Sequence, residues 1–215
     1  GIAHEIRNPL SGINIHLDII EKFFHAPDKS GKTISSIQAV RSASHKIELV
    51  IRRVMNFAKP TEPRFARIHI NDPVREAVKL TRVALNKKGI EIVEDLADNL
   101  PDCFAEPHLM EELVLNLINN ASDAVSGIRD KGVIKVTSTC ENHRIRLIVE
   151  DNGPGIDQDL KEKIFDPFFT TKKHSTGIGL SLCHRIVTDH QGELTAGESE
   201  LSGAAFTVEI PAQPF

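Results

Sequence analysis

The stretch IVEDNGPGI, residues 148–156, joins a short apolar run directly to a turn with two glycines. The residues before the turn alternate in polarity and predict a β-strand that ends at Asp151. Gly153 and Gly155 permit a tight backbone turn against a ligand. Asp151 is acceptor-only and is suited to receive the exocyclic amino group of adenine. An ordinary strand-to-loop turn has the same composition, so this motif alone leaves both interpretations open.

A second motif, NLINNASDA at residues 116–124, lies in a strongly helical segment. Asn116, Asn120 and Asp123 are spaced by four and three residues, which places them on one face of a helix. Amide oxygens on one face can contact a hydrated Mg²⁺, which prefers hard oxygen ligands. A polar face that is simply hydrated is the alternative interpretation.

A third motif, TGIGLSL at residues 176–182, opens a predicted amphipathic helix at 178–190. Glycines at a helix N-terminus leave backbone N–H groups available to an anion, and the helix dipole favours the negative charge. A single Gly-x-Gly pair is a weak signal when taken alone.

The segment FDPFFTTKKHS, residues 165–175, separates the second glycine motif from the first. The aromatic side chains of Phe165, Phe168 and Phe169 can anchor one end of a loop. The polar remainder predicts a lid, in which Lys172 and Lys173 either meet phosphate groups or are solvated.

Together these motifs, in this order and at these distances, resemble the Bergerat-fold (GHKL) ATPases, a group that contains gyrase, a heat-shock chaperone, mismatch-repair ATPases and histidine kinases. The P-loop pattern GxxxxGK[ST] is absent. The resemblance covers the second domain and implies that ATP binds there with Mg²⁺, for which Asn120 is the expected ligand. The nucleotide contacts implied are Asn116, Asn120, Asp123, Asp151, Gly153, Gly155, Ile156, Phe165, Lys172, Thr176, Gly177, Gly179 and Leu180.

The remaining pattern of residues 61–215 predicts an α/β sandwich with helices on one face of a mixed sheet. A short strand within 67–72 runs into a helix, with Asn71 or Asp72 as its N-cap. The further predicted elements are a strand at 90–96, a helix at 106–125, a strand pair at 133–140 and 144–151, and a closing hairpin at 192–199 and 204–211.

Residues 1–60 have a different pattern of apolar residues, which predicts a helical hairpin. Apolar positions recur at alternating spacings of four and three, typical of a coiled-coil seam. A turn at 25–32 separates the two helices, and KPTEP at 59–63 reads as a linker. One hairpin cannot bury both seams, so we expect a homodimer through residues 1–58 with a four-helix bundle. The seam positions are Ile6, Leu10, Ile13, Leu17, Ile20 and Phe24, then Ile37, Val40, Ser44, Ile47, Ile51, Val54 and Ala58.

The chain is therefore predicted to be an α+β protein with two domains, a dimerisation and phosphotransfer domain at 1–60 and an ATP-binding domain at 61–215. The stretch HEIRNPL, residues 4–10, resembles the H-box of two-component sensor histidine kinases, and FDPFF resembles their F-box. Hydrolysing relatives carry a water-activating Glu four positions before the magnesium Asn, where this chain has Asn116. A missing base suits transfer of phosphate to a side chain. The sequences of HEIRNPL and of NASDA, residues 120–124, resemble those of nitrogen-regulator-like sensors.

The resemblance implies that His4 is phosphorylated from ATP and passes the phosphoryl group to an Asp of a response regulator. His4 lies off the predicted seam, so a mobile ATP-binding domain can reach it. Glu5 is implied as the base that takes the imidazole proton. Asn8, one helical turn after His4, is implied in phosphatase activity towards the regulator. The other histidines are expected to be ordinary exposed residues: His16, His25, His45, His69, His108, His143, His174, His184 and His190.

Two alternatives are a hydrolysis-driven ATPase clamp and a binding scaffold that has lost catalysis. The H-box on a seamed hairpin and Asn116 argue against the clamp. The presence of Asn120, Asp151 and the glycines argues against the scaffold.

Composition excludes other classes of protein. The 215 residues are 40% hydrophobic, which is typical of a globular protein. Their net charge of −4 disfavours nucleic acid and anionic membranes as partners. Three separated cysteines indicate reduced thiols in a cytoplasmic protein. No apolar run reaches the roughly 18 residues of a membrane span, so this stretch is expected not to contact a membrane. The chain starts without Met inside a helical pattern and is expected to be a fragment whose upstream part would hold any sensor or anchor.

Overall fold

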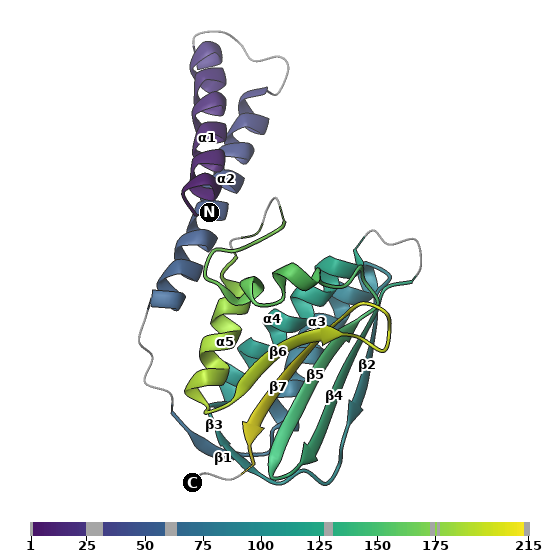
Figure 1. The fold of residues 1–215 in the computed structure, drawn as a ribbon. Helices are drawn as coiled ribbons and strands as arrows, with labels where there is room; N and C mark the ends of the chain where they lie inside the picture. Colours follow the sequence, from purple (N-terminus) through teal and green to yellow (C-terminus); the bar gives the residue numbers. More distant parts are fainter. Residues whose placement is uncertain are drawn as a thin grey trace. The chain divides into compact units, whose positions relative to one another are not determined.

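The structure is a computed structural model that describes residues 2–24, 32–58, 64–126, 131–172, 175 and 177–212. It describes the backbone alone at residues 2–5, 7, 23, 24, 45, 46 and 48–58. The chain divides into two compact units, Gly1–Pro60 with Pro167–Ile178 and Thr61–Asp166 with Gly179–Phe215. Figure 1 shows the elements of both units.

The first unit contains two long helices, α1 (Ile2–Phe24) and α2 (Lys32–Ala58), which pack against each other (Figure 1). Both predicted helices are present. The predicted turn lies outside the described residues except for Lys32, which begins α2, and the predicted linker at 59–63 lies outside them entirely. Between the helices, His16 Nδ1 lies 3.4 Å from the hydroxyl of the buried Ser36.

The second unit is built on a five-stranded sheet in the order β2-β4-β5-β7-β6 (Figure 1). Strand β2 is parallel to β4, and the other neighbouring pairs are antiparallel. The predicted mixed sheet, central strand pair and closing hairpin are therefore confirmed. The strands are β2 (Glu91–Leu96), β4 (Val133–Glu141), β5 (Arg144–Asp151), β6 (Glu193–Glu198) and β7 (Ala204–Pro211).

Three helices cover one face of this sheet: α3 (Asn71–Lys87), α4 (Pro107–Val125) and α5 (Gly179–Asp189). Alternate side chains of β4, β5 and β7 are buried, because successive residues of a strand point to opposite faces. The buried side chains join those of the helices in one apolar core. Its largest fully buried members include Met110, Leu113, Leu117, Ile118, Ile134, Ile145, Leu147, Ile186 and Ile210. Two 3₁₀ turns, η1 (Gln158–Leu160) and η2 (Lys163–Phe165), follow β5.

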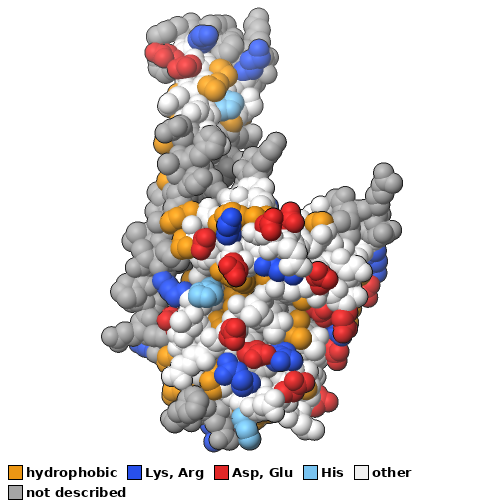
Figure 2. Space-filling model, viewed as in Figure 1, with side chains coloured by type: hydrophobic (Ala, Val, Ile, Leu, Met, Phe, Trp, Pro, Cys, Tyr) orange, Lys and Arg blue, Asp and Glu red, His pale blue; other side chains and the backbone are white. Residues whose placement is uncertain are grey.

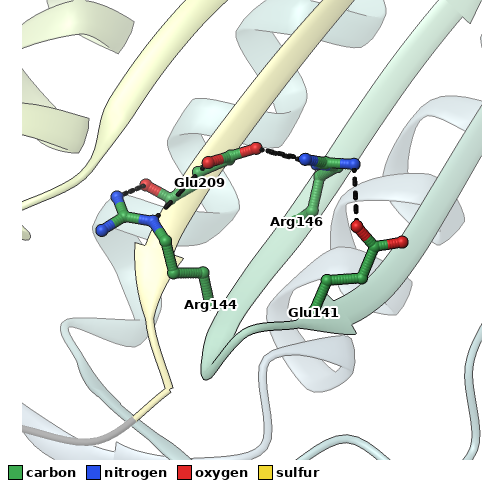
Figure 3. A network of polar contacts seen from close by, with 4 residues as sticks. All are labelled: Glu141, Arg144, Arg146 and Glu209. Atoms are coloured by element: carbon green, nitrogen blue, oxygen red, sulfur yellow. Dashed lines mark hydrogen bonds and ion pairs between the residues drawn. The ribbon is translucent and has the colours of Figure 1, made fainter.

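The opposite face of the sheet is polar. Glu209 on β7 accepts from Arg146 at 2.7 Å and pairs with Arg144 at 3.5 Å, and Arg146 also pairs with Glu141 at 3.3 Å (Figure 3). Charged side chains of both signs are interspersed on the surface seen in Figure 2. Partly exposed ion pairs of this kind contribute little individually, so this face keeps the sheet hydrated more than it stabilises the fold.

Only one strand of a second, two-stranded sheet was predicted from the sequence. The expected strand is β1 (Ala66–Ile68), and it pairs antiparallel with β3 (Cys103–Ala105), where the sequence pattern predicts no element. A three-residue strand offers too few positions for polarity to alternate visibly, so only its pairing partner reveals it.

The predicted N-cap of the helix at 71 is wrong. Ile70 occupies the N-cap position without a side-chain cap bond, and the helix already includes Asn71 and Asp72. Asn71 is fully buried, and its Nδ2 donates to the carbonyl of Ala97 at 2.9 Å. The side chain expected to cap its own helix instead ties α3 to the end of β2.

The expectation that His190 is exposed is also wrong, because it is only 5% exposed. Its Nδ1 lies 2.7 Å from the carbonyl of Ile186 and must donate, while Nε2 accepts from the Glu106 N–H at 3.0 Å. The ring also contacts Phe65, with centroids 4.8 Å apart. Burial lowers the pKa of His190, against the opposing effects of its bond to Ile186 and of Asp189 and Glu106. The neutral imidazole therefore links α5 to the N-cap of α4.

Candidate nucleotide-binding site

Asp151 is the last residue of β5 and is almost completely buried, with 2% of its surface exposed. Its Oδ1 accepts from the backbone N–H of Gly153 at 2.8 Å and of Ala204 at 3.3 Å. One donor lies in the turn after β5 and the other at the start of β7, so the orientation of the carboxylate is determined from both sides. Such a buried, oriented acceptor suits a ligand amino group.

Glycine allows the loops to approach Asp151 this closely. A Cβ on Gly203 would lie 2.3 Å from the Asp151 carbonyl oxygen and 2.5 Å from Oδ1, which no side chain could tolerate. A Cβ on Gly153 would meet Oδ1 at 2.8 Å and the Cβ of Ala124, on α4, at 3.1 Å. Gly155, with φ of +78°, completes the turn. The predicted glycine turn thus packs against the C-terminal part of the predicted asparagine helix.

The asparagine face of α4 also meets the start of α5. Asn116 is half-buried, and its Nδ2 donates to the carbonyl of Glu112 at 2.9 Å. Its Oδ1 lies 3.5 Å from where a Cβ on Gly179 would be, so the amide oxygen lies beside the first residue of α5. One turn further on, Asn120 is half-buried, and Asp123 is exposed.

Three apolar members of the predicted site, Ile156, Phe165 and Leu180, are half-buried and pack against the core of the second unit. The Phe165 ring also lies near that of His184, with centroids 5.8 Å apart. These side chains connect the candidate site to the apolar core of the second unit.

The segment Pro167–Ile178 belongs to the first compact unit. The Phe168 N–H donates to the Gly177 carbonyl at 2.9 Å. Gly177 has φ of +67°, and a Cβ there would lie 2.5 Å from the carbonyl carbon of Phe168, so glycine is required. Lys172 is exposed, and its N–H donates to Thr170 Oγ1 at 3.1 Å. Thr176 and Lys173 lie outside the described residues.

In the first unit, His4 and Glu5 lie on α1, but their side chains are outside the described set. Asn8 is on the same helix and is exposed. The relation of these residues to the nucleotide site therefore stays a prediction.

The turn between β6 and β7, which supplies Gly203 and leads into Ala204 at the start of β7, was not predicted as part of the site. Its sequence, SELSG at 199–203, looks like any hairpin turn. Only its proximity to Asp151, about fifty residues earlier in the chain, distinguishes it.

Other kinds of chemistry have little support among the described residues. No three His, Cys, Asp or Glu side chains there form a cluster that could hold a metal ion by itself. Cys103, Cys140 and Cys183 are free thiols, and burial, with Asp102 nearby, raises the pKa of Cys103 to about 11. Burial also raises the pKa of Cys183 strongly. Such thiols are poor nucleophiles because the thiolate is disfavoured.

Burial raises the pKa of Glu112 as well, while Arg185 opposes the shift. No described helix is long and apolar enough to cross a bilayer.

Comparison with known proteins identifies the family. Residues 105–214 match the model of the "Histidine kinase-, DNA gyrase B-, and HSP90-like ATPase" family. The chain is 32% identical over its whole length to the signal transduction histidine-protein kinase AtoS of Escherichia coli K12, of which it covers 34%. The chain thus spans about a third of that relative.

Solved structures agree. The crystal structure of histidine kinase ThkA in complex with response regulator protein TrrA superposes with a TM-score of 0.76 at 28% identity, covering 98% of this chain and 60% of that one. Full-length ShkA in complex with AMPPNP gives a TM-score of 0.72 at 26% identity, covering 97% of this chain and 44% of that one.

These matches confirm the predicted resemblance to the GHKL group and, within it, to sensor histidine kinases, whereas the nitrogen-regulator-like subgroup stays a prediction. The family match spans α4, the Asp151 turn and α5, which are the elements that meet at the site. The chain belongs to the histidine kinase-, DNA gyrase B- and HSP90-like ATPase family, and its similarity to sensor histidine kinases extends over its whole length.

Proposed function

We propose that the chain is the catalytic core of a two-component sensor histidine kinase that phosphorylates His4 from MgATP and transfers the phosphoryl group to an Asp of a response regulator. The observation that carries the proposal is the whole-length similarity to AtoS, which includes the hairpin with His4 as well as the nucleotide-binding fold. The similarity to ThkA, which was crystallised in complex with the response regulator protein TrrA, supports a response regulator as the partner. The domain division at residue 60 is part of this proposal.

The described geometry supports a specific set of nucleotide contacts. Asp151 would accept from the adenine amino group, because its carboxylate is buried and oriented by two N–H donors. Asn120, half-buried on α4, would supply an amide oxygen to Mg²⁺, whose remaining ligands would be phosphate oxygens and water. Gly179, at the N-terminus of α5, would expose backbone N–H groups to phosphate.

The remaining proposed contacts fall into two groups. Gly153, Gly155, Ile156, Phe165 and Leu180 would shape the walls of the site. Asn116, Asp123, Lys172, Thr176 and Gly177 would lie on its polar and phosphate sides.

The proposed reaction joins the two units. A ring nitrogen of His4 attacks the γ-phosphorus of ATP, the bond to the β–γ bridging oxygen breaks, and ADP leaves. Glu5 takes the proton from the imidazole. Hydrolysing relatives have a base at the position of Asn116. An amide there would not activate water, so the phosphoryl group would not be lost to hydrolysis. Asn8 would position a water that hydrolyses the phosphorylated regulator.

Incubation with ATP labelled at the γ-phosphate tests the proposal. We expect label on the protein that is lost in acid and stable in alkali, the signature of phosphohistidine. Steady release of labelled phosphate without protein label would indicate a hydrolysing ATPase. ATP binding with neither result would indicate a scaffold.

Asp151→Asn should weaken ATP binding because an amide N–H₂ would replace an acceptor that faces the adenine amino group. We expect a loss of roughly 2–3 kcal/mol, or about 30- to 150-fold in Kd. Calorimetric titration measures it, with exposed Asp159→Asn as the matched control. Wild-type affinity in Asp151→Asn, or equal binding of ATP and GTP by the wild type, would contradict the adenine assignment.

We also propose that the chain dimerises through its helical hairpin. Three seam residues stay substantially exposed in one protomer, Leu10 at 45%, Leu17 at 48% and Ile37 at 42%, and Ile15 and Ile34 are more exposed still. A second hairpin would cover such aliphatic side chains in a four-helix bundle. Sedimentation equilibrium should give the mass of a dimer at micromolar concentrations. Leu17→Glu should shift the mass towards the monomer, whereas a wild-type monomer would contradict the proposal.

A further inference from the structure

The turn between β6 and β7, residues 199–203, contacts two neighbouring carboxylates at the end of β5. Successive side chains of a strand point to opposite faces of the sheet, so Glu150 and Asp151 point apart. The turn nevertheless reaches both of them. Ser199 Oγ and the Glu200 N–H each donate to Glu150 Oε1 at 3.2 Å, while the Ala204 N–H donates to Asp151.

The contact with Glu150 adds to the backbone hydrogen bonds that hold the turn. Glu150 is 7% exposed and Ser199 is 8% exposed, so water competes little for these bonds. Ser199 Oγ also accepts from the Leu201 N–H at 2.8 Å, and the Ser199 N–H donates to the Gly203 carbonyl at 3.0 Å. A single carboxylate oxygen thus orders the hydroxyl around which the turn is built.

The other end of the turn leaves Asp151 little freedom. Gly203 is so close to Asp151 that a Cβ would lie 2.5 Å from its Oδ1 and 2.5 Å from the backbone nitrogen of Gly153. Displacement of the turn would therefore move both the Ala204 donor and the wall against which Asp151 rests. The orientation of the Asp151 carboxylate depends on where the turn lies.

We propose that Glu150 is a positioning residue for nucleotide recognition: through Ser199 and the 199–203 turn, it holds the Asp151 carboxylate in the orientation that receives adenine. The inference rests on the proposed nucleotide role of Asp151. Glu150 lies on the face of the sheet opposite Asp151, so it would act without contacting the nucleotide that Asp151 receives.

The test compares ATP with purine riboside triphosphate, which lacks the 6-amino group, by calorimetric titration of the whole chain. The wild type should bind ATP more tightly. Glu150→Ala should raise the Kd for ATP about fivefold and leave that of the analogue within about twofold, because only ATP uses the oriented acceptor. Glu150→Gln keeps an acceptor oxygen and should give an intermediate ratio.

Further variants separate positioning from general stability. Ser199→Ala should reproduce part of the loss, because it removes the hydroxyl donor to Glu150 and leaves the Glu200 N–H donor in place. The double variant should lose less than the sum of the two single losses, because the two variants share the Ser199–Glu150 hydrogen bond. Glu141→Ala removes an exposed carboxylate of the same sheet and should leave the ratio unchanged. Thermal unfolding is measured for each protein. If Glu150→Ala does not fold, Glu150→Gln and Ser199→Ala decide by the same ratio.

The possible results are distinct. Equal weakening of both ligands, or an unchanged ATP preference, would overturn the positioning role of Glu150. A wild-type protein that does not prefer ATP over the analogue would instead overturn the adenine role of Asp151 in the proposed function.

Discussion

His4→Gln should abolish protein labelling by γ-labelled ATP while leaving ATP affinity unchanged. The glutamine amide keeps a polar side chain of similar reach on α1, but its nitrogen lone pair is delocalised and cannot attack phosphorus. A neutral imidazole, with its ordinary pKa near 6.5, has an available lone pair at neutral pH. His4 lies in the hairpin, and the proposed nucleotide contacts lie elsewhere in the chain. The variant should therefore lose phosphoryl transfer and keep the ATP affinity of the wild type.

The measurement pairs an autoradiographic rate with calorimetric ATP binding. His16→Gln is the matched control, because His16 lies on the same helix and Gln retains a polar group toward Ser36. It should label at nearly the wild-type rate. Acid-labile label persisting on His4→Gln would place the nucleophile at another histidine.

Glu5→Ala and Asn8→Ala should impair different activities. Glu5 neighbours the nucleophile, and loss of a general base typically slows proton transfer by about 10²-fold or more, so autophosphorylation should fall by that factor. An amide is not a base, so Asn8→Ala should keep substantial autokinase activity. The exposed Asn8 can position a water, and its loss should sharply lower dephosphorylation of the regulator.

Two rates for each variant test this division: label appearing on the kinase, and label leaving a regulator that was phosphorylated beforehand. Asn8→Gln, which keeps the amide, serves as the comparison for Asn8→Ala. If Asn8→Ala autophosphorylated as slowly as Glu5→Ala, Asn8 would belong to the kinase reaction or to the packing around Pro9.

Local periodicity was sufficient to predict most elements of the second unit. The strand pair at 133–140 and 144–151 alternates in polarity over enough residues to be recognised, and it occurs as β4 and β5. The helix predicted at 106–125 occurs as α4 from Pro107 to Val125. These signals depend on neighbours within four residues, so they are readable without the fold.

The errors share a physical cause. Asn71 was expected to cap its own helix, but its amide donates to Ala97, 26 residues away. His190 was expected in solvent, but its ring accepts from Glu106, 84 residues earlier. In both cases the side chain makes a hydrogen bond to a distant part of the chain in place of the local role that its residue type favours. Because the side chain is buried, it has no water to bond with, so the distant partner fixes its position.

The sequence by itself therefore determined the motifs, their order and hence the family: the asparagine helix, the Asp151 turn and the second glycine pair are each defined by spacings of a few residues. Only the tertiary structure decided what surrounds Asp151. The Gly203 contact and the Ala204 donor come from the end of a turn and the start of β7, some fifty residues away, and Glu150 accepts hydrogen bonds from that turn on the other face of the sheet. Their proximity follows from the pairing of β5 with β7, a register that depends on the whole sheet and that no short stretch of sequence specifies.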